Sequence, residues 1–185
     1  MTDFVVAFLA LLAVLAHAAL ALFLLLAGAS LVSSRARATL AAVRAYLAGI
    51  ELPLAWTVAA VATSGSLFFS EVAGFVPCRL CWYQRDAMYP LVALLALAAF
   101  RRLRPYVPFF LPVPLIGLAV SVHHHYIERF PEAESASCRA GIPCSTRWIW
   151  EFGYVSIPVL AGTAFALVAV LLCAGWRSSM HLTAV

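Results

Sequence analysis

Residues 53–85, PLAWTVAAVATSGSLFFSEVAGFVPCRLCWYQR, decide the fold of this chain. The segment 53–75 is mostly apolar and meets the length of about 20 residues that a helix needs to cross a bilayer. It leads directly to two cysteines separated by two residues, Cys78 and Cys81, and a further apolar segment follows. The stretch therefore predicts a membrane helix that ends in a pair of thiols at the membrane surface.

The composition of the whole chain agrees with a membrane protein. Hydrophobic residues make up 65% of the 185 residues and charged residues only 11%, with a mean hydropathy of +0.99, whereas about a quarter of the residues of a soluble domain are charged. All twelve basic residues are arginine and they are scattered, so the net charge of +4 does not indicate a nucleic-acid partner. We expect a single all-α, polytopic membrane helix bundle.

Five apolar segments predict five membrane-spanning helices. The first covers 4–32, and the segment 33–52 has arginines together with apolar residues at three- and four-residue intervals, which is typical of a helix at the membrane surface. The other four spans are expected at 53–75, 82–100, 107–127 and 152–173.

We accordingly divide the chain into three parts. Residues 1–52 form the N-terminal span and the interfacial segment. Residues 53–176 form a four-helix core, and residues 177–185 form a cytoplasmic tail.

The arginines predict the orientation of the bundle. If the five helices alternate, seven of the twelve arginines fall on one side, which is cytoplasmic by the positive-inside rule. They are Arg35, Arg37, Arg44, Arg101, Arg102, Arg104 and Arg177. The opposite side then receives Cys78, Cys81 and the segment 128–150, which contains Cys138 and Cys144. Both cysteine pairs are expected outside the cytoplasm, where thiols are readily oxidised.

The two cysteine pairs suit two different reaction partners. Cys138 and Cys144 lie in a loop, which we expect to be exposed and mobile enough to exchange with the thiol of another protein. Cys78 and Cys81 lie at the membrane surface, where a lipid-soluble quinone ring can approach. Arg85 is one helical turn beyond Cys81, so the positive helix end and the guanidinium both favour a thiolate, and Arg85 can also donate hydrogen bonds to a quinone oxygen. Trp82 and Tyr83 offer flat surfaces nearby.

A family resemblance rests on the same residues. The motif CRLCWYQR at 78–85, followed by Tyr89-Pro90, is similar to the signature of the DsbB/BdbC disulfide bond formation proteins. The similarity continues through Arg101–Arg104, the histidine-rich end of the fourth span, Pro143-Cys144-Ser145 and Ile157-Pro158, and so covers about 53–173. The close spacing of the second cysteine pair resembles BdbC more than DsbB.

The resemblance implies a function and a role for each site residue. It implies a protein-disulfide:quinone oxidoreductase in which Cys81 is the quinone-facing thiolate, Cys78 its disulfide partner and Arg85 a quinone contact. Cys138 and Cys144 would exchange with an extracytoplasmic thioredoxin-fold thiol oxidase of the DsbA/BdbD kind. The quinone would be ubiquinone or menaquinone. Residues 1–52 have no counterpart in the usual four-helix pattern.

Other functions remain open at this stage. A vitamin K epoxide reductase-like protein also couples a quinone with two cysteine pairs, but it usually places the loop pair first. Four thiolates could bind zinc, although the wide second spacing and the oxidising side argue against it. A membrane protein with structural disulfides is a third alternative. A conduit for cytoplasmic electrons would need reactive cysteines on the inner side, where only Cys173 is expected.

Several other polar residues have weaker interpretations. The three histidines at 123–125 point about 100° apart on a helix, so at most two face the bundle, and a place among the lipid headgroups is favoured over proton transfer. Glu71 is seven residues before Cys78 and is expected deeper on the same helix face, where it either takes part in quinone protonation or remains a structural residue. His17 and Cys173 are expected to be packing residues.

Overall fold

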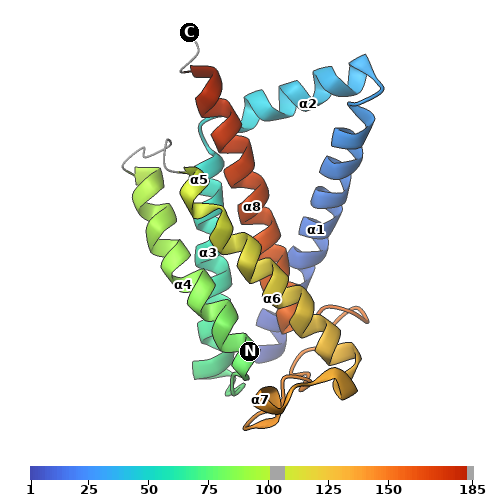
Figure 1. Cartoon of the computed structure of the whole chain (residues 1–185), viewed down its shortest axis with the longest axis vertical. Coiled ribbons are helices and arrows are strands. Elements are labelled where there is room, and N and C mark those ends of the chain that lie inside the picture. Colours follow the sequence, from blue (N-terminus) through green and yellow to red (C-terminus); the bar gives the residue numbers. More distant parts are fainter. Residues whose placement is uncertain (101–106, 183–185) are drawn as a thin grey trace.

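The computed structural model describes residues 1–100 and 107–182 and is built almost entirely from helices (Figure 1). The long helices are α1 (Thr2–Ala29), α2 (Ser34–Leu47), α3 (Glu51–Leu67), α4 (Arg79–Phe100), α6 (Pro112–Arg129) and α8 (Ile157–Leu182). The short ones are the π-helix η1 (Phe68–Val72), α5 (Val107–Phe110), the 3-10 helix η3 (Pro131–Ala133) and α7 (Ala136–Arg139). The predicted all-α class is confirmed.

Three of the described helices are long and apolar enough to cross a membrane by themselves. They are α1, the continuous helix Glu51–Val72, and Ile157–Gly175 of α8. The predicted spans 82–100 and 107–127 correspond to α4 and α6, whose polar residues gather in the turns nearest the cysteines. The chain is thus a membrane helix bundle. The predicted arginine turn at 101–104 lies outside the described residues.

Four helices, α3, α4, α6 and α8, pack together as the core of the bundle. Its largest buried cluster joins small residues of α3 to large ones of α4 and α8. Among its members are Ala55, Ala59, Leu91, Leu95, Phe165 and Val168. Without a hydrophobic force between helices in lipid, such close packing against small residues stabilises the bundle by van der Waals contact.

Helices α1 and α2 lie beside this core. Figure 1 shows α1 close to α8 near the N-terminus and separated from it at the other end, where α2 crosses from α1 to α3. Val6, Ala10 and Ala13 of α1 are buried, while most of its leucines are exposed on the outer surface, as expected of a helix that faces lipid. Ser33 caps α2, because its hydroxyl accepts a hydrogen bond from the Ala36 N–H.

The last span begins later than its predicted start at residue 152. Glu151 and Val155 pair as an isolated β-bridge, and the turn between them requires positive φ at Phe152 (50°) and Gly153 (74°). A helix cannot include these conformations, so α8 begins at Ile157.

The helix before the first cysteine pair ends earlier than predicted. It stops as a π-turn at Val72, and Gly74, with φ of 72°, redirects the chain before Cys78. Glu71 is therefore not on the same helix face as Cys78. Its side chain is exposed and accepts a hydrogen bond from the Ser70 hydroxyl at 2.9 Å, so the predicted helix face shared with Cys78 is wrong.

We predict that the contact between α6 and α8 at Gly117 is intolerant of one methyl group. A Cβ built on Gly117 would lie 2.3 Å from the Phe165 ring, which is fully buried and cannot move away. Gly117→Ala should lower stability by about 1–3 kcal/mol, measured as a lower Tm in detergent. Gly28→Ala is the matched control, since nothing lies within 4 Å of that position. Equal Tm values for the two variants would contradict the close contact.

Candidate functional site

Cys78 and Cys81 meet at the first turn of α4. Cys78 is the residue before the helix, and its sulfur accepts a hydrogen bond from the backbone N–H of Cys81 at 3.3 Å. The two residues are free thiols whose Sγ atoms lie 2.9 Å apart. The two-residue spacing therefore forms a hydrogen-bonded dithiol, one sulfur of which caps the positive end of the helix.

Negative charge is stabilised on Cys78. The thiol of Cys81 donates a hydrogen bond to Cys78, and His124 adds a hydrogen bond and an electrostatic attraction, which together lower the pKa of Cys78 to about 4 despite its burial. Proximity to the helix N-terminus acts in the same direction. These contacts thus favour the thiolate on Cys78 and leave the proton on Cys81.

His124 connects the two cysteine pairs. Its imidazole is only 2% exposed, with Nδ1 3.3 Å from Nε2 of Gln84. Because the amide donates to Nδ1, the ring proton belongs on Nε2, which lies 3.5 Å from the Cys78 sulfur and 3.0 Å from the backbone oxygen of Cys144. The prediction that the histidines lie among the lipid headgroups is wrong for His124.

Cys138 and Cys144 form a disulfide that is buried, not exposed as predicted. The two residues are 4% and 0% exposed, and they share a buried cluster with Cys78, Leu80 and Ile127. The second cysteine pair is therefore packed directly against the first.

The loop is folded over the disulfide by hydrogen bonds to Glu134. Its carboxylate accepts from the backbone N–H and the hydroxyl of Ser145, each at 3.2 Å. The guanidinium of Arg139 donates to the backbone oxygen of Glu134. These contacts join the two ends of the loop, which explains the burial that the loop composition did not predict.

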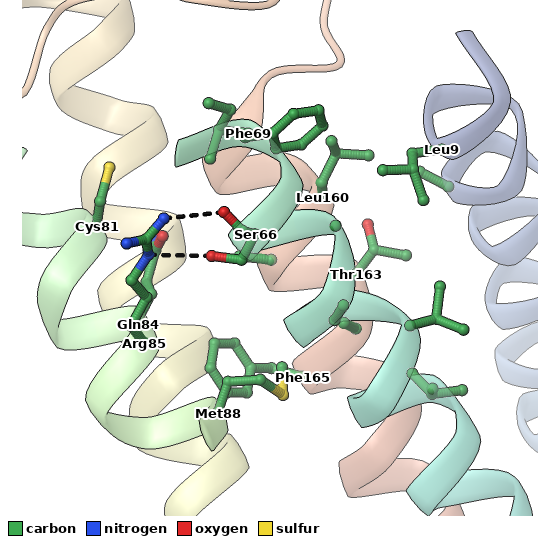
Figure 2. A pocket seen from close by; sticks show the side chains of 18 of the residues that line it. Leu9, Ser66, Phe69, Cys81, Gln84, Arg85, Met88, Leu160, Thr163 and Phe165 are labelled. Atoms are coloured by element: carbon green, nitrogen blue, oxygen red, sulfur yellow. Dashed lines mark hydrogen bonds between the residues drawn. The ribbon is translucent and has the colours of Figure 1, made fainter. Parts of the chain in front are cut away.

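Cys81 faces a cavity of about 330 Å³ bounded by α1, α3, α4 and α8. Figure 2 shows Cys81, Gln84 and Arg85 on one side of this pocket and Leu9 of α1 on the other. Most of the other lining residues are apolar, and Cys78 is not among them. The two thiols of the pair thus have different neighbours, the loop disulfide for Cys78 and the pocket for Cys81.

Arg85 is fixed at the edge of the pocket by Ser66 of α3. Its Nε donates to the Ser66 hydroxyl at 3.0 Å and its Nη2 to the Ser66 backbone oxygen at 2.9 Å. The guanidinium also lies 5.3 Å from the Trp82 ring centre. Its Nη1 has no hydrogen-bond partner among the described residues, so it can donate to a ligand in the pocket. Trp82 and Tyr83 are exposed and do not line the pocket, so the flat surface of Trp82 lies near the site, against Arg85, but outside the pocket.

The lining suits a flat apolar molecule with a hydrogen-bond acceptor at its edge. Ligand pockets are usually mostly apolar, with a few fixed polar groups, and have volumes from about 300 Å³ upward. A zinc site of four thiolates is not formed, because Cys138 and Cys144 are bonded to each other. The donors of Cys78, Cys81 and His124 do lie within 4.8 Å of one another, but three donors are one fewer than a structural zinc site needs.

The sequence interpretation missed the polar face of α6. Gly117, Ser121, His124 and Glu128 are spaced four, three and four residues apart, and all four are buried. Such spacing places them on one helix face. The repeat of small and polar residues within an apolar span could therefore have predicted that this face of α6 is buried in the bundle. The prediction that at most two of the three histidines face the bundle is confirmed, since His123 is exposed.

Comparison with known proteins agrees with this site. The family model described as disulfide bond formation protein DsbB matches residues 50–175. Disulfide bond formation protein C of Bacillus subtilis is 43% identical over 122 residues, which cover 64% of this chain and 86% of that protein. A probable disulfide formation protein of Oceanobacillus iheyensis is 43% identical over 126 residues, 65% of this chain and 84% of the relative. Probable disulfide formation protein C 2 of Bacillus anthracis is 40% identical over 121 residues, 65% of this chain and 86% of the relative.

No solved structure matches the chain significantly. The family match begins one residue before α3 and continues to Gly175 of α8, so it contains the four core helices and both cysteine pairs. The chain therefore belongs to the DsbB family of disulfide bond formation proteins.

Proposed function

We propose that the protein is a membrane thiol:quinone oxidoreductase that reoxidises an extracytoplasmic thioredoxin-fold thiol oxidase and passes two electrons to a membrane quinone. The observation that supports this most strongly is the position of the first cysteine pair. Cys78 packs against the Cys138–Cys144 disulfide, while Cys81 opens to an apolar pocket beside Arg85. The pair thus lies between a protein-exchangeable disulfide and a site for a lipid-soluble ring.

The first half of the reaction is thiol–disulfide exchange. A thiolate of the partner attacks the Cys138–Cys144 bond, and the partner's second thiol then closes the partner's disulfide and leaves two thiols in the loop. One of these attacks the Cys78–Cys81 disulfide, which restores the loop disulfide and leaves a dithiol at the first pair.

The second half takes place at the pocket. A quinone accepts two electrons and two protons to become a hydroquinone. Cys81 faces the pocket and donates its proton toward the sulfur of Cys78, 2.9 Å away, so the negative charge of the reduced pair is held on Cys78. As the S–S bond reforms, the pair gives up two electrons and the one proton held on Cys81, the second proton comes from the aqueous side, and Arg85 stabilises the negative charge that develops at the ring oxygen. The apolar lining excludes water and strengthens that interaction.

The charges of the two ends support an outward-facing cysteine end. Seven of the eight acidic residues stand on segments at that end of the bundle, and Glu51 is the exception. Arg35, Arg37 and Arg44 stand on α2 at the opposite end. We accordingly propose that α2 and the C-terminus are cytoplasmic.

The cysteine assignment predicts a graded set of losses. Cys78→Ser and Cys81→Ser should each reduce quinone-dependent turnover to the rate without enzyme. Cys138→Ser should stop oxidation of the partner but retain turnover with a small dithiol that reaches the first pair directly. Cys173→Ser is the control, because that exposed thiol lies outside the site. Stopped-flow quinone absorbance measures all four, and wild-type turnover by Cys81→Ser would remove the first pair from the mechanism.

Arg85→Lys tests whether the guanidinium has a directional role. A lysine keeps the positive charge but lacks the planar guanidinium. In Arg85 that group binds Ser66 through Nε and Nη2 while Nη1 remains available to a ligand. A lost charge-assisted hydrogen bond costs about 1.5–3 kcal/mol, so KM for quinone should rise roughly tenfold to a hundredfold. Exchange between the loop and the partner should not change. Arg85→Gln should raise KM at least as much, whereas an unchanged KM in both variants would show that Arg85 does not bind the quinone.

The proposed orientation predicts one-sided labelling. In single-cysteine variants that lack the five native cysteines, Ser137→Cys lies on the exposed surface of α7 and Ala41→Cys on the exposed surface of α2. A membrane-impermeant maleimide should label Ser137→Cys in intact cells, and Ala41→Cys only after the membrane is permeabilised. The reverse pattern would place the disulfide in the cytoplasm and exclude the proposed partner.

A further inference from the structure

The extra N-terminal helix forms part of the candidate quinone pocket. Leu9, Leu12, Ala13 and Ala16 of α1 line the same cavity as Cys81 and Arg85. They are spaced three, one and three residues apart, so they occupy one face of the helix. The matched family region begins at residue 50, and this wall is therefore an addition to the four core helices.

Helix α1 is attached to the core by apolar packing and by a polar contact. Val6 belongs to a buried cluster with Phe69 and Ile149, and Ala10 and Ala13 belong to another with Val155. Gly65 of α3 allows a close approach, since a Cβ there would lie 3.0 Å from Leu9 Cδ1.

His17 makes the polar contact in the middle of α1. Thr163 of α8 donates its hydroxyl proton to the Val159 backbone oxygen at 2.7 Å, so it accepts from Nε2 of His17, also at 2.7 Å. Nδ1 then accepts from the Tyr154 hydroxyl at 3.1 Å. An isolated imidazole in a membrane span is costly, and this pairing fixes both the depth and the rotation of α1. The expected packing role of His17 thus includes two directional hydrogen bonds.

The two ends of the pocket differ in chemistry. Most of its polar lining groups stand at the α4 side, whereas α1 contributes only apolar side chains (Figure 2). A ring that reacts at Cys81 and accepts a hydrogen bond from Arg85 must lie at the α4 side. The remaining apolar part of the molecule then extends along α3 and α8 toward α1.

We propose that α1 binds the prenyl chain of the quinone, with Leu9, Leu12, Ala13 and Ala16 as the contact face and His17 as the residue that positions it. This inference rests on the proposed function and assigns the apolar tail of its quinone to a contact face on α1. Helix α1 lies outside the family match. Its contacts with the tail would therefore add to those that the core helices α3 and α8 make in the same pocket.

The test compares one quinone ring with and without its tail. The full-length protein, reduced by dithiothreitol, is assayed with menaquinone-4 and menadione, and with ubiquinone-2 and ubiquinone-0. Ala16→Phe fills the pocket at α1, so KM for the prenylated quinones should rise roughly tenfold, while KM and kcat for the tailless quinones should stay within about twofold. Ala18→Phe is the matched control, since Ala18 is exposed on α1 and does not line the pocket.

Two further variants separate tail recognition from damage to the fold. Leu12→Ala removes a contact without adding bulk, and His17→Ala removes both hydrogen bonds of α1. Each should raise KM for the prenylated quinones while leaving turnover of the tailless quinones unchanged. The tailless substrates thereby report that the pocket and the cysteines are intact.

The outcomes distinguish this inference from the proposed function. If the wild-type protein reduces both kinds of quinone but Ala16→Phe and Leu12→Ala match Ala18→Phe, α1 does not bind the tail, and the proposed function remains. Equal losses with prenylated and tailless quinones would also overturn tail recognition. If the wild-type protein reduces no quinone, the proposed function fails, and the role of α1 fails with it.

Discussion

The backbone N–H of Cys81 donates a hydrogen bond to the sulfur of Cys78 at the first turn of α4, and this contact orients the whole site. It fixes Cys78 at the helix end, where the partial positive charge favours a thiolate. Since Cys81 follows within one turn, its sulfur must lie beside the first, yet it points toward the pocket. In the proposed function, electrons thus enter the pair at Cys78, which contacts the loop disulfide, and leave it at Cys81, which faces the pocket.

The position of α6 determines what lies opposite Cys78. Gly117 lets α6 approach Phe165 of α8 more closely than any other residue would allow. Seven residues along the same helix face, His124 then reaches both the Cys78 sulfur and the backbone of Cys144. The close contact between Gly117 and Phe165 in the middle of the bundle thereby helps to set the position of His124 between the two cysteine pairs.

The sequence was sufficient to predict the helices and those site residues whose positions follow from short-range spacing. Apolar segment lengths predicted the helices, and the spacing of Cys81 and Arg85 predicted one shared helical face, since each depends only on residues within a turn or a span. The burial of the loop disulfide was not predictable in this way, because Glu134 holds the loop through Ser145, eleven residues away. The late start of α8 depends likewise on the turn at residues 152–153.

The burial of Cys138 and Cys144 has a consequence for the order of exchange. While Glu134 holds the loop closed, the disulfide is adjacent to Cys78 but covered from the surface. In the proposed function, the partner's thiolate must reach a disulfide that the closed loop covers, so the loop must open for the first exchange and close against Cys78 for the second. The two exchanges of the proposed function therefore require two positions of the loop.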